Sequence, residues 1–309
     1  MGNVLYSGTL QHVRKAALAT TFISSHDLDN ILPLKGFELD NFTSGRRVFL
    51  QHGVLGRKSV EYDKKYYHHP FDLFCVSSEP EKKLVEKNMG YAPDEVKITG
   101  LSRFDHLLKR KKQRQSILLI PTWRDWFSSY SSFKKSSYFN KYQSLLKNDK
   151  LHHLLEKHDL TMDFYLHYRM HPFISDFKSF GSDRINIVRF DEKNVQTLLI
   201  ENRLLITDYS SVSFDFNYMS KPVVFYHFDV PLFFKRGILR PISETFLGDI
   251  CHKENQLVQA IEKYINNGFK EDPKIAEKKG AIFSHIDTNN NQRIYNEITK
   301  INKNSEKLG

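Results

Sequence analysis

The stretch LLITDYSSVSFDF, residues 204–216, decides which fold the chain is expected to adopt. Its first residues, 204–206, form an apolar run long enough for the end of a buried strand, and small polar residues follow. From Val212 onward the apolar spacing favours a buried helix, although that spacing also fits a strand. A strand that passes through polar residues into a helix leaves unpaired backbone N–H groups, which bind anions with the help of the helix dipole. The stretch therefore predicts a phosphate-binding loop at the carboxyl edge of a parallel sheet, the alternative being that Ser210 or Ser211 only caps a helix.

Length and composition indicate a globular protein that binds something anionic. The chain has 309 residues, 40% of them hydrophobic and 13% aromatic, which is enough for two globular domains. No apolar segment approaches the ~20 residues that a membrane-spanning helix needs, and the amino terminus lacks a secretory-signal pattern. Cys75 and Cys251 have no metal-ligand spacing and are interpreted as small buried residues of a reducing compartment.

The formal charge of +10 favours phosphorylated substrates, acidic lipid headgroups or nucleic acid as partners. The basic run KRKKQR at residues 109–114 fits a solvated helix end or linker, and equally a patch for membranes or polyanions. Charge alone does not choose among these partners.

Strand and helix patterns alternate along the chain, which is typical of α/β proteins with parallel sheets. The expected strands are residues 46–50, 71–77, 96–99, 117–120, 164–167, 185–188, 204–206 and 222–226. The expected helices are residues 13–22, 79–88, 102 towards 110, 138–147, 151–158, 195–201, 254–266, 273–284 and 292–302. Residues 55–69 are expected to form a loop.

Polar side chains gather at the ends of four of these strands, where doubly wound sheets bind their ligands. They are His52, Thr122, Arg124, Arg169, His171, Ser210 and Ser211. Four are cationic or can become so and the other three are hydroxyl donors, a set that suits a pyrophosphate. A metal is less supported, because no carboxylate cluster accompanies the histidines. Each also has a structural alternative: a turn at His52, a surface ion pair at Arg124, a helix start at His171.

Seven blocks that occur in one order carry a resemblance to a known family. They are LQHGVLGRKSV (50–60), ITGLSRFDHL (98–107), IPTWRD (120–125), YRMHPF (168–173), LLITDYSSVSFDF (204–216), KPVVFYHFD (221–229) and FSHIDTNNNQRI (283–294). Together they resemble the CDP-glycerol:poly(glycerophosphate) glycerophosphotransferases, the teichoic-acid primases and polymerases, from about residue 46 to residue 294. The resemblance implies a GT-B-like α/β fold in which two Rossmann-like domains face each other across a cleft.

The expected domains are a shortened acceptor-side domain at residues 1–112, a CDP-alditol-binding domain at 113–285, and a C-terminal helix at 286–309 that returns to the first domain. The first is expected to be short because only some 45 residues precede the His-Gly motif.

The same resemblance implies transfer of glycerol phosphate or another alditol phosphate from a CDP-alditol to a hydroxyl of a lipid-linked or polymeric acceptor, with release of CMP. This reaction belongs to the synthesis of teichoic acids or capsule-type polymers. His52 would be the general base, which an imidazole can be near neutral pH, and His171 would offset charge on the phosphoryl group. The implied donor contacts are Gly53, Val54, Leu55, Gly56, Arg103, Pro121, Thr122, Arg124, Arg169, Met170, Ser210, Ser211 and Asp215. No metal and no cofactor is expected beyond the donor itself, CDP-glycerol or CDP-ribitol.

Location and partners follow from the same interpretation. A lipid-linked acceptor implies work at the cytoplasmic face of the membrane, where basic residues would bind the anionic surface peripherally. Nucleic acid is not expected as a partner, because the aromatic residues lie mostly in apolar runs. The His-Gly motif departs from many members at Gln51, Val54 and Leu55, which leaves the choice of alditol and acceptor open. The alternatives are a non-catalytic nucleotide-binding relic, one module of a larger polymerase, and a nucleotide-sugar glycosyltransferase of the same fold.

Overall fold

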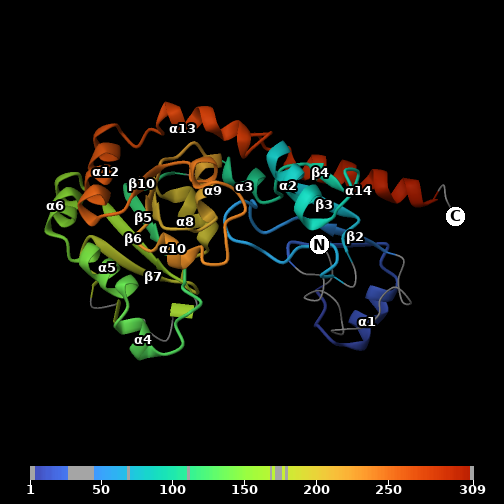
Figure 1. Cartoon of the computed structure of the whole chain (residues 1–309), viewed down its shortest axis with the longest axis horizontal. Coiled ribbons are helices and arrows are strands. Elements are labelled where there is room, and N and C mark those ends of the chain that lie inside the picture. Colours follow the sequence, from blue (N-terminus) through green and yellow to red (C-terminus); the bar gives the residue numbers. More distant parts are fainter. Residues whose placement is uncertain are drawn as a thin grey trace. The chain divides into compact units, whose positions relative to one another are not determined.

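The computed structural model describes residues 4–26, 45–67, 70–109, 112–167, 169–170, 176–177 and 180–306 (Figure 1). Contacts within the chain divide it into two compact units. The first unit contains Met1–Leu55, Ser59–Leu108 and Gly280–Gly309, and the second contains Gly56–Lys58 and Lys109–Lys279. The domain bounds expected at residues 112 and 285 stay predictions, because a compact unit is not by itself an independently folding domain.

The first unit contains a parallel sheet. Among its described residues the strand order is β1-β2-β3-β4, with β1 (Thr21–Ser24), β2 (Arg46–Phe49), β3 (Leu73–Val76) and β4 (Val96–Ile98). Its helices are α1 (Leu10–Ala17), α2 (Glu79–Met89), α3 (Phe104–Leu107) and α14 (Asn290–Glu306). Ile294 of α14 packs against Val48, Leu73 and Cys75, so the last helix covers one face of this sheet (Figure 1).

The second unit is built on a larger parallel sheet. Its described strands run in the order β10-β9-β8-β5-β6-β7. They are β5 (Ser116–Ile120), β6 (Thr161–Leu166), β7 (Ile185–Arg189), β8 (Leu204–Thr207), β9 (Val223–Tyr226) and β10 (Asp249–Cys251). Numbered from β5, this is the 3-2-1-4-5-6 order of dinucleotide-binding folds, and the order reverses between β5 and β8. The switch point of the sheet therefore lies between these two strands.

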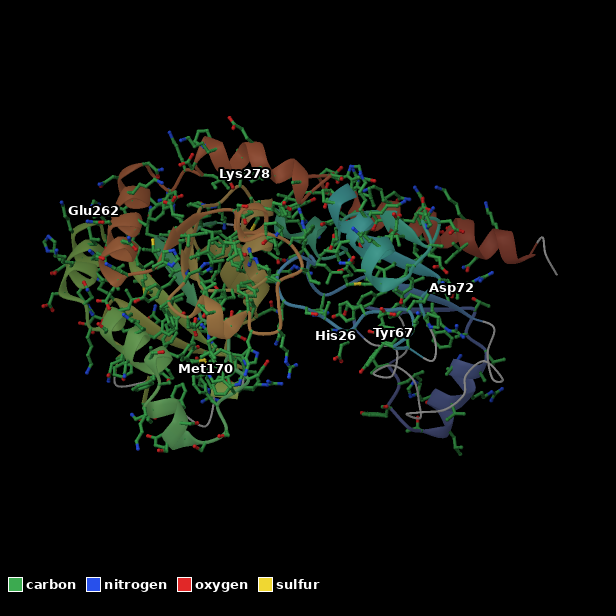
Figure 2. All side chains as sticks on the ribbon, viewed as in Figure 1. His26, Tyr67, Asp72, Met170, Glu262 and Lys278 are labelled. Carbon is green, nitrogen blue, oxygen red and sulfur yellow. The ribbon has the colours of Figure 1, made fainter. Side chains whose placement is uncertain are left out.

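Helices cover both faces of the second sheet because the apolar side chains of its strands point alternately to one face and to the other. The helices are α4 (Tyr130–Lys134), α5 (Ser137–Leu146), α6 (Asp149–Lys157), α8 (Val195–Glu201), α9 (Val212–Tyr218), α10 (Val230–Phe233), α11 (Ile242–Thr245), α12 (Glu254–Asn266) and α13 (Pro273–Lys278). Ile117 and Leu119 of β5 pack with α4, α5, α6 and α12, whereas Leu118 and Ile120 pack on the opposite face with α8 and α9. Glu262 on α12 and Lys278 on α13 carry exposed charges on the outside of this unit (Figure 2).

The structure confirms most expected elements and corrects a few. The bounds of α8 and α12 are those predicted, and the segment from Val212 is helical. The helix expected at residues 13–22 ends at Ala17, because residues 21–24 pair in parallel with β2. The helix expected at 273–284 ends at Lys278 and continues as a 3-10 turn through Gly280, a residue that disfavours helices.

Two further differences concern short segments. The helix expected from residue 102 is confined to Phe104–Leu107 within the described residues. The strand β10 was not predicted, because its three residues carry no periodic signal. No helix in the described part of the chain combines the length and apolarity that crossing a membrane requires.

Candidate functional site

The His-Gly loop of the first unit is held by one buried carboxylate, that of Glu81. Glu81 is 0% exposed and lies in the first turn of α2. Its Oε1 accepts from Leu55 N at 2.6 Å and from Gln51 Nε2 at 3.4 Å, and its Oε2 accepts from Ser77 N and Ser77 Oγ at 2.6 and 2.7 Å. Burial raises the pKa of Glu81, and these hydrogen bonds oppose the shift by favouring the ionised form. The carboxylate thereby fixes both ends of the loop that carries His52.

The residue before His52 has an uncommon backbone conformation. Gln51 has φ of 59°, the left-handed region, and its side chain is buried and donates to Cys75 O at 2.5 Å. Non-glycine residues in this region cluster at functional sites, where surrounding structure must hold them. Here the contacts of Gln51 and Glu81 provide that support, and His52 follows with an exposed side chain.

The surroundings of the His52 imidazole are compatible with the tautomer and charge that a base needs. Its Nδ1 lies 3.3 Å from Ser25 O; because a carbonyl only accepts, the tautomer with a proton on Nδ1 donates to Ser25 and keeps the lone pair on Nε2, which lies 3.4 Å from the Tyr62 hydroxyl. The ring stacks on His26 at 4.8 Å, and the Tyr62 hydroxyl lies 3.1 Å from Nδ1. Partial burial lowers the pKa of His52, and the nearby His26 and Arg103 lower it further while the bond to Ser25 opposes them. His52 is therefore mainly neutral at pH 7.

Arg103 lies beside His52 in the first unit, and its predicted contact with the donor stays a prediction. Its Nη1 donates to His52 O at 2.8 Å, so the guanidinium holds the backbone of the loop. The other loop residues, Gly53, Val54 and Leu55, are buried, and only His52 among residues 51–55 is exposed. Gly56 belongs to the second unit, where a Cβ would lie 2.9 Å from Thr245 Cγ2 and would not fit.

In the second unit, the loops after β5 and β8 meet at the switch point. Thr122 N donates to Asp208 Oδ1 at 2.8 Å, and Thr207 Oγ1 donates to Ile120 O at 2.6 Å. Pro121 is buried, whereas the Thr122 hydroxyl is buried without a hydrogen-bond partner among the described residues. The polar loops predicted from separate parts of the sequence are thus neighbours.

The two predicted serines lie at the start of α9. Ser211 is exposed and its side chain makes no capping hydrogen bond, so the simple capping alternative does not describe it. Ser210 is half-buried; its Oγ accepts from Val212 N at 3.4 Å and its carbonyl accepts from Arg57 at 2.6 Å. Asp215, one turn into α9, is 3% exposed.

Arg124 holds the two loops together from inside. It is 0% exposed, and its guanidinium pairs with Asp229 through Nε at 2.8 Å and Nη2 at 3.0 Å. Its Nη1 pairs with Asp208 Oδ2 at 2.8 Å and donates to Thr122 O at 2.6 Å. Although burial disfavours its charge, the carboxylates of Asp208 and Asp229 raise the pKa of Arg124. The surface ion pair considered as an alternative is thus a buried one, and the predicted donor contact of Arg124 stays a prediction beside this structural role.

The remaining predicted residues are placed differently from one another. Arg169 is exposed, and its Nη1 pairs with Asp125 Oδ1 at 2.8 Å. Asp125 also pairs with Lys58 at 2.8 Å, and the hydrogen bond from Lys58 lowers the pKa of Asp125. Met170 is 0% exposed and packs in the core of the second unit, where its sulfur accepts from Tyr138. His171 lies outside the described residues, so its predicted role stays a prediction.

Sequence reasoning missed three residues that organise these loops. Arg57 is 5% exposed; its Nη1 donates to Ser210 O and Ser213 Oγ at 2.6 and 2.7 Å, and its Nη2 donates to Thr245 O. Its partners are 153 to 188 residues away along the chain, so spacing gave no signal. Asp208 and Glu81 were missed as well. A signal for Glu81 existed in the Ser-x-x-Glu pattern of a capping box at Ser78.

The described residues hold no group of three or more histidine, cysteine, aspartate or glutamate side chains arranged for a metal ion. Cys75 and Cys251 are free and buried, and burial raises the pKa of both thiols, to about 12 and about 11. The chemistry that the arrangement offers is therefore that of a neutral imidazole in one unit and of hydroxyls and guanidinium groups in the other.

Curated relatives of this chain carry names that refer to teichoic acid synthesis. The chain is 28% identical over 320 residues to the minor teichoic acid biosynthesis protein GgaB of Bacillus subtilis (strain 168), a match that covers 98% of the chain and 35% of the relative. It is 26% identical to the teichoic acid glycerol-phosphate primase of the same strain, with 87% and 65% covered, and 23% identical to the ribitol-phosphate polymerase TarK of Staphylococcus aureus (strain NCTC 8325 / PS 47), with 79% and 48% covered. The chain thus spans about a third to two thirds of the length of these relatives.

Solved structures establish the fold class. The wall teichoic acid polymerase TagF matches with a TM-score of 0.60 at 18% identity, covering 84% of the chain and 69% of TagF. The UDP co-structure of S. aureus MnaA matches with a TM-score of 0.54 at 13% identity, covering 97% and 81%. These likenesses confirm the predicted GT-B-like α/β fold. A family model for CDP-Glycerol:Poly(glycerophosphate) glycerophosphotransferase matches residues 32–300, and the chain belongs to that family.

Proposed function

We propose that this chain transfers an alditol phosphate from a CDP-alditol to a hydroxyl of a polymeric or lipid-linked acceptor and releases CMP. The observation that carries the proposal is a contact at the switch point of the second sheet. There, Thr122 donates to Asp208, which lies in the same loop as Ser210 and Ser211. Ligands of doubly wound sheets bind at this point, and the Thr122 hydroxyl is buried there without a partner among the described residues. Family membership and the teichoic-acid relatives support the same reaction.

In the proposed reaction, His52 is the general base. Nε2 of its neutral ring accepts the proton of the acceptor hydroxyl while that oxygen attacks the β-phosphorus of the donor. The bond between this phosphorus and the bridging oxygen breaks, and CMP leaves with the electron pair. Hydrogen bonds from Thr122 and Ser211 and the positive charge of Arg169 would stabilise charge on the phosphoryl oxygens and on CMP.

The identity of the alditol is a finer proposal. Relatives named for glycerol phosphate and for ribitol phosphate both match this chain, at 26% and 23% identity. We take CDP-glycerol as the first donor to test, because the family model that matches is named for it. CDP-ribitol is the second donor.

Action at the inner membrane surface is proposed from charge. The formal net charge is +10, and an acidic leaflet attracts each nearby cation by about 1 kcal/mol. We therefore expect peripheral binding to anionic membranes, which bear a lipid-linked acceptor. Flotation with anionic and neutral liposomes at low and high salt tests this, and equal recovery in all four conditions would reject it.

One alternative has a specific observation in its favour. The chain spans 35% of GgaB, which fits a transferase module that works within a longer polypeptide. Such a module would bind the donor and need a further segment for its acceptor.

Release of CMP separates these possibilities. Purified protein is incubated with CDP-glycerol, CDP-ribitol and common nucleotide sugars, with and without a membrane extract as acceptor, and CMP is measured by chromatography. We expect acceptor-dependent CMP release from a CDP-alditol and none from nucleotide sugars. Calorimetric binding of CDP-glycerol without turnover would favour the relic or the incomplete module, and turnover of a nucleotide sugar would favour a glycosyltransferase.

A further inference from the structure

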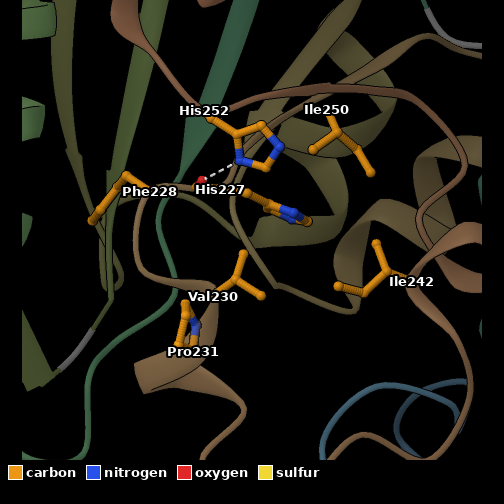
Figure 3. Close-up of a pocket in the computed structure, with 7 residues that line it drawn as sticks. All are labelled: His227, Phe228, Val230, Pro231, Ile242, Ile250 and His252. Carbon is orange, nitrogen blue, oxygen red and sulfur yellow. Dashed lines mark hydrogen bonds between the residues drawn. The ribbon is translucent and has the colours of Figure 1, made fainter.

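A cavity of about 530 Å³ lies in the second unit beside the carboxyl ends of β9 and β10 (Figure 3). Its lining consists of His227, Phe228, Val230, Pro231, Ile242, Ile250 and His252. This volume falls within the range of small-molecule sites, about 300–1,000 Å³. None of these residues belongs to the loops proposed to bind the CDP-alditol, so the cavity needs an explanation of its own. We call it the histidine pocket.

One nitrogen of the histidine pocket is buried without a hydrogen-bond partner. His227 is 2% exposed, and its Nε2 lies 2.9 Å from Asp208 O. Because a carbonyl only accepts, Nε2 carries the proton, and Nδ1 is left as an acceptor. This Nδ1 is buried and has no partner among the described residues. Burial lowers the pKa of His227 to about 4, so the ring is neutral at pH 7.

An unpaired buried acceptor points to a missing donor. Leaving such a group unsatisfied costs about 1–3 kcal/mol, and most buried polar groups in proteins have partners. In the view of Figure 3, the ring of His227 extends toward the space that Ile242 and Ile250 line. A donor from a molecule bound in that space would satisfy Nδ1.

The second imidazole of the pocket is oriented in a similar way. His252 Nδ1 lies 2.8 Å from His227 O, so it donates to this carbonyl, and in the neutral ring Nε2 is a second acceptor. The two ring centroids are 6.5 Å apart. The remaining five lining residues are apolar. The pocket thus combines two acceptors with apolar walls.

This combination selects one ligand chemistry. An anion would face no lysine or arginine among the lining residues. A structural metal site usually needs four protein ligands and a catalytic one three, more than the two imidazoles provide. A purely apolar molecule would leave Nδ1 of His227 unsatisfied. A polyol or sugar offers hydroxyl donors to the acceptors and C–H groups to Val230, Ile242 and Ile250.

We propose that the histidine pocket binds a neutral polyol or sugar unit, with a hydroxyl donating to Nδ1 of His227. The site lies next to the donor loops, because the Asp208 carbonyl accepts from His227 while the Asp208 carboxylate accepts from Thr122. The proposal does not depend on the transferase reaction, since it rests on the pocket alone.

Ligand-observed NMR on the full chain tests the proposal with two probes, ribitol for a free alditol and methyl α-glucopyranoside for a sugar ring. The matched variants are Ile250→Trp, which fills the pocket, and Leu232→Trp, which places the same side chain on α10 outside it; the two native side chains are 36% and 49% exposed. We expect at least one probe to bind the wild type and Leu232→Trp, and Ile250→Trp to weaken it at least about tenfold. Binding of either probe supports the proposal and identifies the source of the hydroxyls.

Three results would overturn it: neither probe binds, Ile250→Trp binds as well as Leu232→Trp, or inorganic phosphate displaces the probe. A second measurement guards against misfolding of a variant. Nitrogen-15 spectra of the wild-type chain should show an unprotonated Nδ1 of His227 whose resonance moves when the bound probe is added. A protonated Nδ1, or one that is indifferent to the probe, would contradict the assignment.

Discussion

Both units place a polar loop at the carboxyl end of buried strands, but they hold these loops by opposite charges. In the first unit the carboxylate of Glu81 binds neutral donors of the loop 51–55. In the second unit the guanidinium of Arg124 lies between the carboxylates of Asp208 and Asp229. A lone buried anion needs neutral donors around it, whereas a buried cation between two anions makes each of the three depend on the others.

The difference matters for chemistry as well as for stability. The Glu81 arrangement leaves His52 exposed and mainly neutral, as a base must be. In the Arg124 arrangement the charges pair with one another, and the hydroxyls of Thr122 and Ser211 remain available to a ligand. In the proposed reaction the base belongs to the first unit, and the predicted donor contacts belong to both units.

Removal of the buried cation should have the largest effect on stability. Arg124→Met leaves Asp208 and Asp229 buried without their partner, and we expect unfolding to become easier by about 3–5 kcal/mol. Urea unfolding measures the change. The control is Arg184→Met, which breaks an exposed pair with Asp159 and should cost about 0–1 kcal/mol. Equal losses in the two variants would show that the buried network does not hold the loops.

Neutralisation of the buried anion should cost less, because its partners are neutral. Glu81→Gln retains one acceptor oxygen and puts an amide against Leu55 N or Ser77 N, so we expect a loss of about 1–3 kcal/mol. The matched control is Glu79→Gln, an exposed residue of the same helical turn. If the two variants unfold at the same urea concentration, Glu81 does not organise the loop.

Thr122→Val should separate binding from stability. The hydroxyl is buried without a partner among the described residues, so its replacement by a methyl group should raise the free energy of unfolding by about 1–3 kcal/mol, the cost of leaving such a group unsatisfied. The same change should weaken the binding of CDP-glycerol by about fivefold to tenfold, which corresponds to the loss of one hydrogen bond. Calorimetry measures the affinity, with Thr161→Val at the other end of the neighbouring strand as control. Unchanged affinity together with lower stability would assign the hydroxyl a structural role.

The smallest expected effect concerns the pKa of His52. The base is active when neutral, so activity should fall as the pH drops through a pKa below 6.5. His26→Asn removes a ring that lowers this pKa, and the midpoint of the acid limb should move upward. NMR titration of His52 and the pH profile of turnover should agree. A midpoint that moves downward would show that His26 acts on His52 in another way.

The sequence predicted the parts that depend on local pattern. The strand at 204–206 and the helix after it were readable because apolar spacing, polar loop and helix start are consecutive. The sheet order was not readable, because β5 pairs with β8 across more than eighty residues. Helix α12 has the predicted bounds, since its apolar face repeats over thirteen residues.

Position along the sequence pointed to the exposed and loop residues of the candidate site, whose roles stay predictions. His52, Thr122 and Ser210 follow strands, so position alone singled them out. Glu81 and Arg57 act through contacts distant in sequence, which spacing cannot indicate. Met170 was expected at the donor, but its side chain lies in the core. The distinction between a residue that faces a ligand and one that holds the loop depends on burial, which three-dimensional packing decides.

The central claim, that His52 is the base of a CDP-alditol transferase, is tested most directly by CMP release from His52→Ala. The control is His153→Ala, an exposed residue of α6. The account predicts that turnover falls by about 10²–10⁴-fold in His52→Ala alone, with unchanged unfolding temperature and unchanged affinity for CDP-glycerol. Turnover of His52→Ala at the wild-type rate would contradict it.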